Sequence, residues 1–231
     1  MPNAKTAFTL VEMLVAIAVA ALLAGLLVPC VTAARDAART TECTSNLRQW
    51  GIAVTIYVNT NEGCIPRRGQ GIQVLQRIDR AADWFNCLPP AIGLPSYKAL
   101  VAAGRQPRAG DRSLFICPTA VDPGATRFLP YGMNMYLSPW IRPEPHNISE
   151  IDSPSTLVFM GDAPGQFSAT APCRKLFSPA PRHAGKANLL FLDGHVQSFS
   201  AEYLGCGVGD PRRSDVRWLT GTSGVNQEPV E

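Results

Sequence analysis

Hydrophobic residues are concentrated in one continuous run near the N-terminus of the chain. Residues 13–34 carry no charge, and Glu12 is the only charged residue between Lys5 and Arg35. As an α-helix, this run would be about 33 Å long, enough to cross the hydrocarbon core of a bilayer. The pattern predicts a membrane anchor. A cleaved secretory signal is an alternative, and a buried helix of a soluble domain is the least favoured one.

After Arg35 the pattern becomes that of an amphipathic helix. Apolar residues recur at steps of four and three, with charged residues between them. These apolar residues are Cys43, Leu47, Trp50, Val54 and Tyr57. Turn-forming residues at positions 59–63 end the pattern. We therefore expect one helix from Phe8 to about Asn59, about 78 Å long, with its first half in lipid and its second half against a globular head.

The rest of the chain predicts short elements separated by loops. Helical spacing occurs over residues 72–86, and residues 96–103 form a second short helical pattern. A run of three apolar residues at 114–116 predicts one strand, and the largely apolar run at 156–160 predicts another. The strongest pattern is the pair of apolar runs on either side of Asp193-Gly194, because this dipeptide favours a tight antiparallel hairpin. We expect that hairpin over residues 187–199.

Composition and charge exclude several classes of protein. Charged residues make up 17% of the chain and the formal net charge is +3, which fits neither an acidic disordered tail nor a histone-like protein. Five arginines form the best candidate for a basic patch: Arg105, Arg108, Arg112, Arg212 and Arg213. They are spread over predicted loops, a distribution more typical of a solvated face than of a nucleic-acid site. We expect no nucleic-acid partner.

Nothing in the sequence favours an enzyme. The chain has no Gly-x-Ser-x-Gly elbow, no phosphate-binding loop and no His-Glu-x-x-His zinc motif. It has three histidines, of which His146 lies in a proline-rich stretch with no obvious partner. We therefore predict no catalytic residues and no cofactor, apart from the metal hypothesis described below.

The segment Ala7-Phe8-Thr9-Leu10-Val11-Glu12 resembles the signature of type IV prepilins and type II secretion pseudopilins. The resemblance implies that a prepilin peptidase cuts between Ala7 and Phe8 and that the new amino group of Phe8 is methylated. It makes Glu12 the fifth mature residue and Pro29 the mature proline that many members carry. The family usually has glycine where this chain has Ala7.

Glu12 and Pro29 are also unusual on physical grounds. A carboxylate in an apolar helix is costly, so Glu12 and the Phe8 amine of a neighbouring subunit are expected to pair and set the register of packed helices. The alternative is a tolerated charge that snorkels to the headgroups. Pro29 cannot donate a hydrogen bond to Gly25, so we expect a kink or local melting there, or simply the end of the membrane segment.

A second resemblance lies near the C-terminus. His183, nine intervening residues and Asp193-Gly194 resemble the His-x9-Asp-Gly motif of many pilin-like proteins. In the predicted helix, the run from Cys43 to Gln49 resembles the Cys-x-x-Asn-Leu-[Lys/Arg]-Gln run of a large pilin-like group. Two functions are open for this region. His183, Asp193 and His195, with Asp162, would suit a transition-metal site. The favoured alternative is structural, with Asp193 in the turn, His183 bonded to backbone and His195 pointing to the opposite face from Asp193.

The seven cysteines leave the disulfide pattern open. Setting aside Cys30, which lies in or near the membrane segment, six remain, and these allow 15 pairings. Several buried free thiols are about as compatible with the sequence as a full set of disulfides. No Cys-x-x-Cys pair is present, so a zinc ribbon or thioredoxin-like site is not supported.

Together these patterns predict an α+β, pilin-like protein in which a long N-terminal membrane-spanning helix packs against a small antiparallel sheet in a loop-rich head. We expect a leader at residues 1–7 and a helix at residues 8–60, transmembrane to about residue 34 and amphipathic beyond. The head would occupy residues 61–231, with a loop-rich tail from residue 205.

The predicted role is a structural subunit of a type IV pilus or type II secretion pseudopilus. Its partners would be prepilin peptidase/N-methyltransferase, other pilin or pseudopilin subunits and membrane lipid. The basic leader predicts a cytoplasmic N-terminus and a head outside the inner membrane. The alternative is an anchored or secreted envelope protein, perhaps a binding module, that uses the helix only for targeting.

Overall fold

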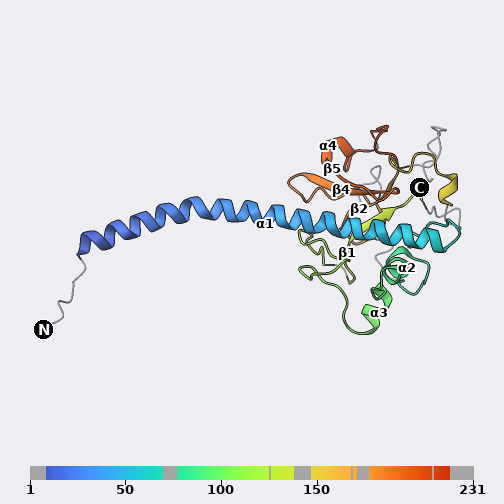
Figure 1. Ribbon diagram of the computed structural model, residues 1–231, viewed down its shortest axis with the longest axis horizontal. Helices are drawn as coiled ribbons and strands as arrows, with labels where there is room; N and C mark the ends of the chain where they lie inside the picture. The colour runs from blue at the N-terminus through green and yellow to red at the C-terminus, as the bar shows by residue number, and fades with distance from the viewer. Residues whose placement is uncertain are drawn as a thin grey trace. The chain divides into compact units, whose positions relative to one another are not determined.

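The computed structural model describes residues 9–69, 77–124, 126–137, 147–167, 169–170, 177–209 and 211–218. The chain divides into two compact units, Met1–Ala38 and Arg39–Glu231. Helix α1 (Leu10–Thr60) contributes to both of them (Figure 1). The leader and cleavage-site residues Ala7 and Phe8 lie outside the described residues.

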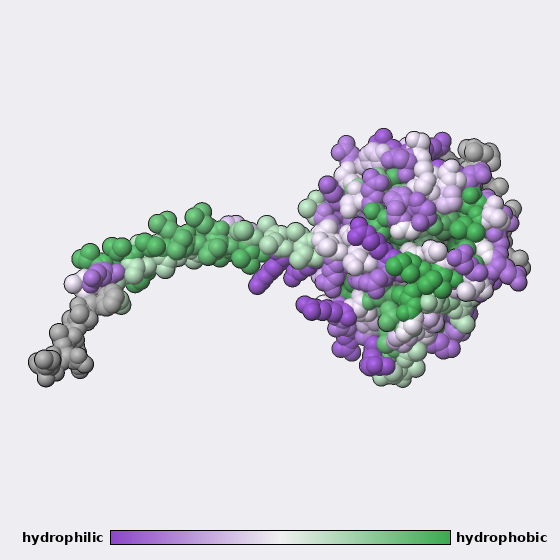
Figure 2. Space-filling view, in the orientation of Figure 1, coloured by the Kyte–Doolittle hydropathy of each residue, from purple (hydrophilic) through white to green (hydrophobic). Residues whose placement is uncertain are grey.

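The first unit contains the apolar part of α1. Every described residue from 9 to 38 is exposed, and the large apolar side chains from Leu10 to Val31 have exposed fractions of 45–76%. Figure 2 shows these hydrophobic residues along the N-terminal part of the helix. α1 is helical through Pro29, so local melting is not observed. By length and composition α1 can cross a membrane.

In the second unit, α1 has one buried face. The buried residues follow the three- and four-residue spacing of a helix: Cys43, Asn46, Leu47, Trp50, Gly51, Ala53, Val54 and Val58. The predicted amphipathic face is thus confirmed, with Tyr57 half-buried at its end. After Thr60 the Gly63 N–H donates to Val58 O over 3.0 Å, and Gly63 adopts a φ of 82° that favours glycine.

The sheet has five strands in the order β3-β1-β2-β4-β5. The strands are β1 (Leu129–Asn134), β2 (Val158–Gly165), β3 (Ala169–Thr170), β4 (Lys186–Phe191) and β5 (Val196–Ser200). The pairs β1–β2, β2–β4 and β4–β5 are antiparallel, but β3 pairs with β1 in parallel. The α+β fold is therefore confirmed, whereas the sheet is mixed because of the two-residue edge strand β3.

Both faces of the three central strands β1, β2 and β4 are buried, whereas the edge strand β5 is largely exposed. Leu190 on β4 and Leu192 after it join the core formed with α1, whereas Leu189 and Phe191 pack with Trp218 in a second cluster. Successive residues of a strand point to opposite faces, so a strand covered on both sides carries a continuous apolar run. This explains the unbroken apolar sequence of residues 189–192.

The predicted hairpin is present, with a longer turn than expected. Strands β4 and β5 are joined by Leu192, Asp193 and Gly194, because Phe191 pairs with His195. Gly194 N–H donates to Phe191 O over 3.0 Å, and Gly194 has a φ of 93°. A three-residue loop with glycine in the left-handed region is a common hairpin connection.

The short helices agree with the sequence in part. Helix α3 (Tyr97–Ala102) is capped by Ser96, as the pattern over 96–103 predicts. Helix α2 (Trp84–Ala91) begins well inside the predicted 72–86 span, so the prediction is wrong for residues 77–83, while residues 72–76 lie outside the described part. Arg67 pairs with this segment through Ala82 O and Trp84 N–H, which prevents helical bonding there. The remaining short elements are α4 (Ala201–Leu204) and the 3₁₀ turn Ile148–Glu150.

The strand predicted at residues 114–116 is wrong. These residues are buried but form a turn, with Ile116 N–H donating to Ser113 O. Side chains of α1 take the place of a partner strand. Asn46 donates to the carbonyls of Ser113 and Ile116, and Trp50 Nε1 donates to Leu114 O over 3.1 Å. Side chains of α1 therefore provide the hydrogen bonds that the buried backbone carbonyls of this segment need.

Candidate functional sites

The first candidate site is the start of α1. Thr9 precedes the first helical residue, and its backbone N–H and hydroxyl each donate to Glu12 Oε2 over 2.8 Å. In return, Glu12 N–H donates to Thr9 Oγ1 over 3.3 Å. This reciprocal arrangement is a capping box, in which two of the unpaired N–H groups at a helix start are satisfied. The Thr-x-x-Glu spacing is its sequence signal, which the sequence analysis missed.

The second candidate site surrounds His183, which lies just before β4. A tight two-residue loop holds it, because His183 and Lys186 exchange both backbone hydrogen bonds at 3.0 Å. The imidazole is buried, with 5% of the residue exposed. Its Nδ1 lies 3.2 Å from Thr40 Oγ1 of α1, and its Nε2 lies 3.3 Å from Asp162 Oδ2 of β2. His183 thus links the C-terminal motif to α1 and to the centre of the sheet.

Asp162 is fully buried beside His183. Its Oδ2 also accepts a hydrogen bond from Asn188 N–H over 2.7 Å, whereas Oδ1 has no hydrogen-bond partner among the described residues. Burial, and secondarily the negative charge of Asp162, raises the pKa of the phenol of Tyr131. Burial lowers the pKa of the nearby Arg182 guanidinium, against the opposing effect of Asp162. Two ionisable groups that interact electrostatically, the Asp162 carboxylate and the Arg182 guanidinium, are therefore buried in this part of the core.

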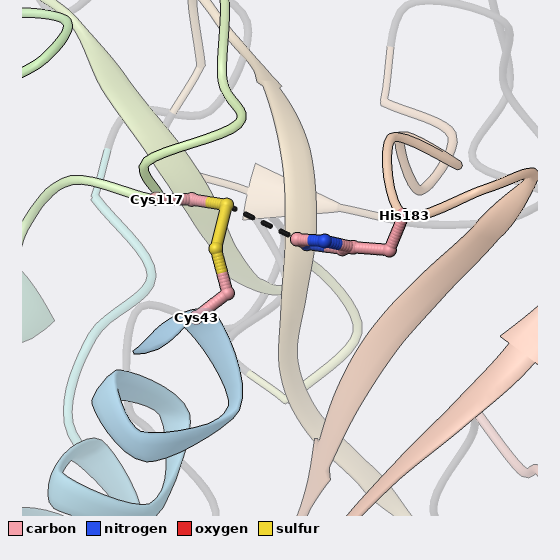
Figure 3. A group of neighbouring side chains, drawn as sticks. All are labelled: Cys43, Cys117 and His183. Carbon is pink, nitrogen blue, oxygen red and sulfur yellow. Dashed lines mark hydrogen bonds between the residues drawn. A yellow bond between two sulfur atoms is a disulfide. The ribbon is translucent and has the colours of Figure 1, made fainter. Parts of the chain in front are cut away.

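A disulfide lies against the same imidazole. Cys43 of α1 is bonded to Cys117, and Cys117 Sγ lies 3.5 Å from His183 Nε2 (Figure 3). The Sγ atoms of both cysteines and a ring nitrogen of His183 all lie within 4.8 Å of one another, and all three residues are buried. The sequence did not associate either cysteine with His183.

The other described cysteines are free. They are Cys30, Cys64, Cys87 and Cys206. Burial raises the pKa of the Cys87 thiol to about 12 and also raises that of Cys206, so these two thiols stay protonated at neutral pH. Cys173 lies outside the described residues.

Asp193 and His195 form a separate pair at the tip of the hairpin. Asp193 Oδ1 lies 2.6 Å from His195 Nδ1 and accepts the His195 backbone N–H over 3.1 Å. The His195 ring is stacked on Phe191 at a centroid distance of 4.2 Å. His195 therefore contacts Asp193 rather than pointing away from it. Among the described residues, neither Asp193 nor His195 belongs to a group of three or more ligand atoms within 4.8 Å of one another. The predicted four-residue metal site is therefore not assembled in the structure.

Gly194 places the hairpin tip against α1. A Cβ atom on Gly51 of the helix would lie 3.2 Å from Gly194 O and 3.3 Å from its Cα. The His-x9-Asp-Gly motif therefore contacts α1 at both of its ends, through His183 with Thr40 and through Gly194 with Gly51. At these two points the segment from His183 to Gly194 lies against α1.

The five arginines of the candidate basic patch lie on exposed segments. Arg105, Arg108 and Arg112 follow α3, whereas Arg212 and Arg213 follow α4. The Arg213 guanidinium lies 4.4 Å from the ring centroid of Tyr203, a cation–π contact within the head.

Comparison with known proteins identifies the N-terminal segment. Residues 2–28 match the family model described as the prokaryotic N-terminal methylation motif. The matched range contains Ala7, Phe8 and Glu12 and ends one residue before Pro29. Neither the comparison with curated proteins nor that with solved structures found a match. The chain thus carries, over residues 2–28, the N-terminal methylation motif of prepilin-type proteins.

Proposed function

We propose that this protein is a structural subunit of a type IV pilus or type II secretion pseudopilus, assembled through α1. The observation that carries the proposal is the methylation motif at residues 2–28, whose residues from Leu10 onward lie in α1, where every described side chain is exposed up to residue 38. In this proposal prepilin peptidase cuts between Ala7 and Phe8, and the Phe8 amine is then methylated.

The exposed apolar helix supports assembly. The large apolar side chains of this segment are 45–76% exposed and lie on all sides of the helix. Exposure of such a surface to water is unfavourable, because full burial of one large apolar side chain contributes about 1.5–3 kcal/mol of stabilising free energy. Lipid before assembly and neighbouring helices after it would both bury this surface. The leader is short enough that its removal leaves the whole apolar segment attached.

The capping box gives Glu12 a partner before assembly. Thr9 donates two hydrogen bonds to the Glu12 carboxylate within one subunit, so the charge is never left without donors in an apolar environment. In the filament, the amine of a neighbouring Phe8 would take over as the stronger, charged partner. Glu12 would then exchange a local cap for a contact between subunits.

The disulfide supports the proposed topology. The Cys43–Cys117 bond belongs to the second unit. Disulfides form and persist in oxidising compartments such as the periplasm and are rare in the cytosol. A cytoplasmic leader with Lys5 and a head outside the inner membrane agree with both the charge and the disulfide.

The experiment is to determine the mature N-terminus by mass spectrometry after expression with and without a prepilin peptidase. We expect an N-methylated Phe8 only when the peptidase is present. Glu12→Gln should keep membrane insertion and cleavage but lose incorporation into filaments. Thr9→Val, which removes the capping hydroxyl and leaves the carboxylate, is the matched control and should still assemble. An N-terminus at Ala34 would show that the segment is only a cleaved signal. If Glu12→Gln is cleaved and still assembles normally, cleavage at Phe8 stands but the proposed role of Glu12 in assembly is refuted.

A further inference from the structure

Three side chains from different parts of the second unit meet at one buried point. Cys43 comes from α1, Cys117 from the loop that leads toward β1, and His183 from the turn before β4 (Figure 3). Their ligand atoms lie within 4.8 Å of one another. Two thiolates and an imidazole are ligands that zinc prefers, and three protein ligands with one further position is a common zinc arrangement.

Two distances around His183 Nε2 match those of a tetrahedral zinc site. With Zn–S near 2.3 Å and Zn–N and Zn–O near 2.0–2.2 Å, tetrahedral angles place N and S about 3.6 Å apart and N and O about 3.4 Å apart. The observed distances are 3.5 Å from His183 Nε2 to Cys117 Sγ and 3.3 Å from Nε2 to Asp162 Oδ2. The two sulfurs would have to separate to about 3.8 Å, and an Asp162 oxygen would have to approach them, because Asp162 is not among the ligand atoms that lie within 4.8 Å of one another.

The surroundings orient His183 as a ligand. Thr40 Oγ1 lies 3.2 Å from Nδ1, so the Nδ1–H tautomer can donate to it and leave the Nε2 lone pair facing the sulfur of Cys117. Metal-bound histidines usually make such a hydrogen bond through their other nitrogen. Asp162 has a carboxylate oxygen, Oδ1, without a hydrogen-bond partner among the described residues, so its side chain can turn toward a fourth position.

We propose that reduction of the Cys43–Cys117 disulfide creates a Zn²⁺ site formed by both Sγ atoms and His183 Nε2, with the fourth position open to water or to Asp162. Reduction by a phosphine or a dithiol supplies two electrons, and two protons complete the two thiols as the S–S bond breaks. Zinc then displaces both thiol protons and forms two Zn–S bonds. The two thiolates neutralise the charge of the ion, and buried Arg182 balances that of Asp162.

The site would hold the same three segments together in either redox state. In the oxidised protein the disulfide joins α1 to the loop that contains Cys117, and His183 packs against it. In the reduced protein the metal would join both cysteines and the turn before β4. This inference is independent of the proposed assembly function, because none of its residues belongs to the methylation motif.

The test is a metal titration of the full chain in detergent micelles. Cys30, Cys64, Cys87, Cys173 and Cys206 are first replaced by serine, so that only the proposed pair of thiols remains. After reduction with a phosphine and its removal without oxygen, Co²⁺ is added as a spectroscopic probe and then displaced by Zn²⁺. We expect one ion per chain, with thiolate-to-cobalt charge transfer and the visible absorption of tetrahedral Co²⁺. The oxidised chain should bind none.

His183→Gln tests the third ligand, and His195→Gln is its matched control. His183→Gln should weaken zinc binding by more than about 100-fold, beyond the loss that removal of an outer hydrogen-bond partner causes. His195→Gln removes an exposed imidazole that contacts Asp193 and should bind normally. The near-ultraviolet circular dichroism of buried Trp50, Trp84 and Trp218 checks the fold of every sample. Equal binding by the oxidised chain or by His183→Gln, no binding by the reduced chain, or loss of the fold on reduction would each overturn the proposal.

Discussion

The two parts of α1 differ in what surrounds them, although they belong to one helix. Up to residue 38 every described side chain is exposed, and the apolar residues lie on all sides. From Cys43 to Val58, by contrast, a single face is buried in the core of the head. A helix that is apolar all round suits lipid or other helices, whereas a one-sided pattern suits a protein core. The environment of the helix changes between Ala38, the last residue of the first unit, and Cys43, the first buried residue.

The largest expected effect is on the free energy of unfolding of the head, when one large apolar side chain is removed from each part of α1 in turn. Trp50 packs edge-on against Trp84 and Phe115 and donates to Leu114 O. Trp50→Ala should lower the free energy of unfolding of the head by about 4 kcal/mol, because it leaves a cavity and an unpaired carbonyl. Thermal unfolding of the full chain in detergent, followed by near-ultraviolet circular dichroism, measures the loss.

The matched control is Leu22→Ala, which removes a side chain that is 71% exposed. It should leave the unfolding temperature of the head unchanged. An equal loss of stability in both variants would mean that the two parts of α1 do not differ in the way described.

A smaller effect comes from the two glycines of α1. A methyl group at Gly51 would lie 3.0 Å from Leu190 Cδ1 and close to the backbone of Gly194, whereas at Gly25 it would meet nothing within 4 Å. Gly51→Ala should therefore destabilise the head by about 1 kcal/mol, since the overpacking exceeds the gain in helix propensity.

Gly25→Ala should not destabilise the head. Chemical denaturation of both variants in the same detergent measures the difference. A Gly51→Ala protein as stable as the unmodified chain would show that the hairpin tip is not tightly packed on α1.

The last effect, of similar size, is a dependence of stability on pH within the head. Burial raises the pKa of Asp83 to about 6, and its carboxylate oxygens have no hydrogen-bond partner among the described residues. The folded protein holds this proton more tightly than the unfolded one. The contribution of Asp83 to the free energy of unfolding is therefore greatest below about pH 4, and it decreases as the pH rises to about 6. Other carboxylates titrate in the same range, so the contribution of Asp83 is isolated by comparison with Asp83→Asn.

Asp83→Asn should stabilise the head by about 1 kcal/mol at pH 7, after allowance for screening by solvent and by Arg80 and Arg67. At pH 4 the variant and the unmodified chain should have nearly equal stability. Unfolding curves at pH 4, 5, 6 and 7 provide the measurement. A difference between the two proteins that does not change with pH would exclude titration of Asp83 as its cause.

Local patterns predicted much of the fold. The apolar spacing after Arg35 located the buried face of α1, and Asp193-Gly194 located the hairpin, because both signals involve residues only a few positions apart. The same reasoning failed at residues 114–116. Their backbone partners are Asn46 and Trp50 of α1, which a short apolar triplet does not reveal. The parallel pairing of β3 with β1 was also missed, because a strand of two residues has no recognisable hydrophobic pattern.

The sequence by itself determined the methylation motif, the apolar segment and the long helix, because charge, hydrophobicity and spacing along one segment define them. Only the tertiary structure decided which histidine meets which carboxylate and that His183 lies beside the Cys43–Cys117 disulfide. Those two cysteines are 74 positions apart, and His183 is 66 positions beyond Cys117. Contacts over such separations depend on how α1, the loops and the sheet pack together, and packing is a property of the whole core rather than of any one segment.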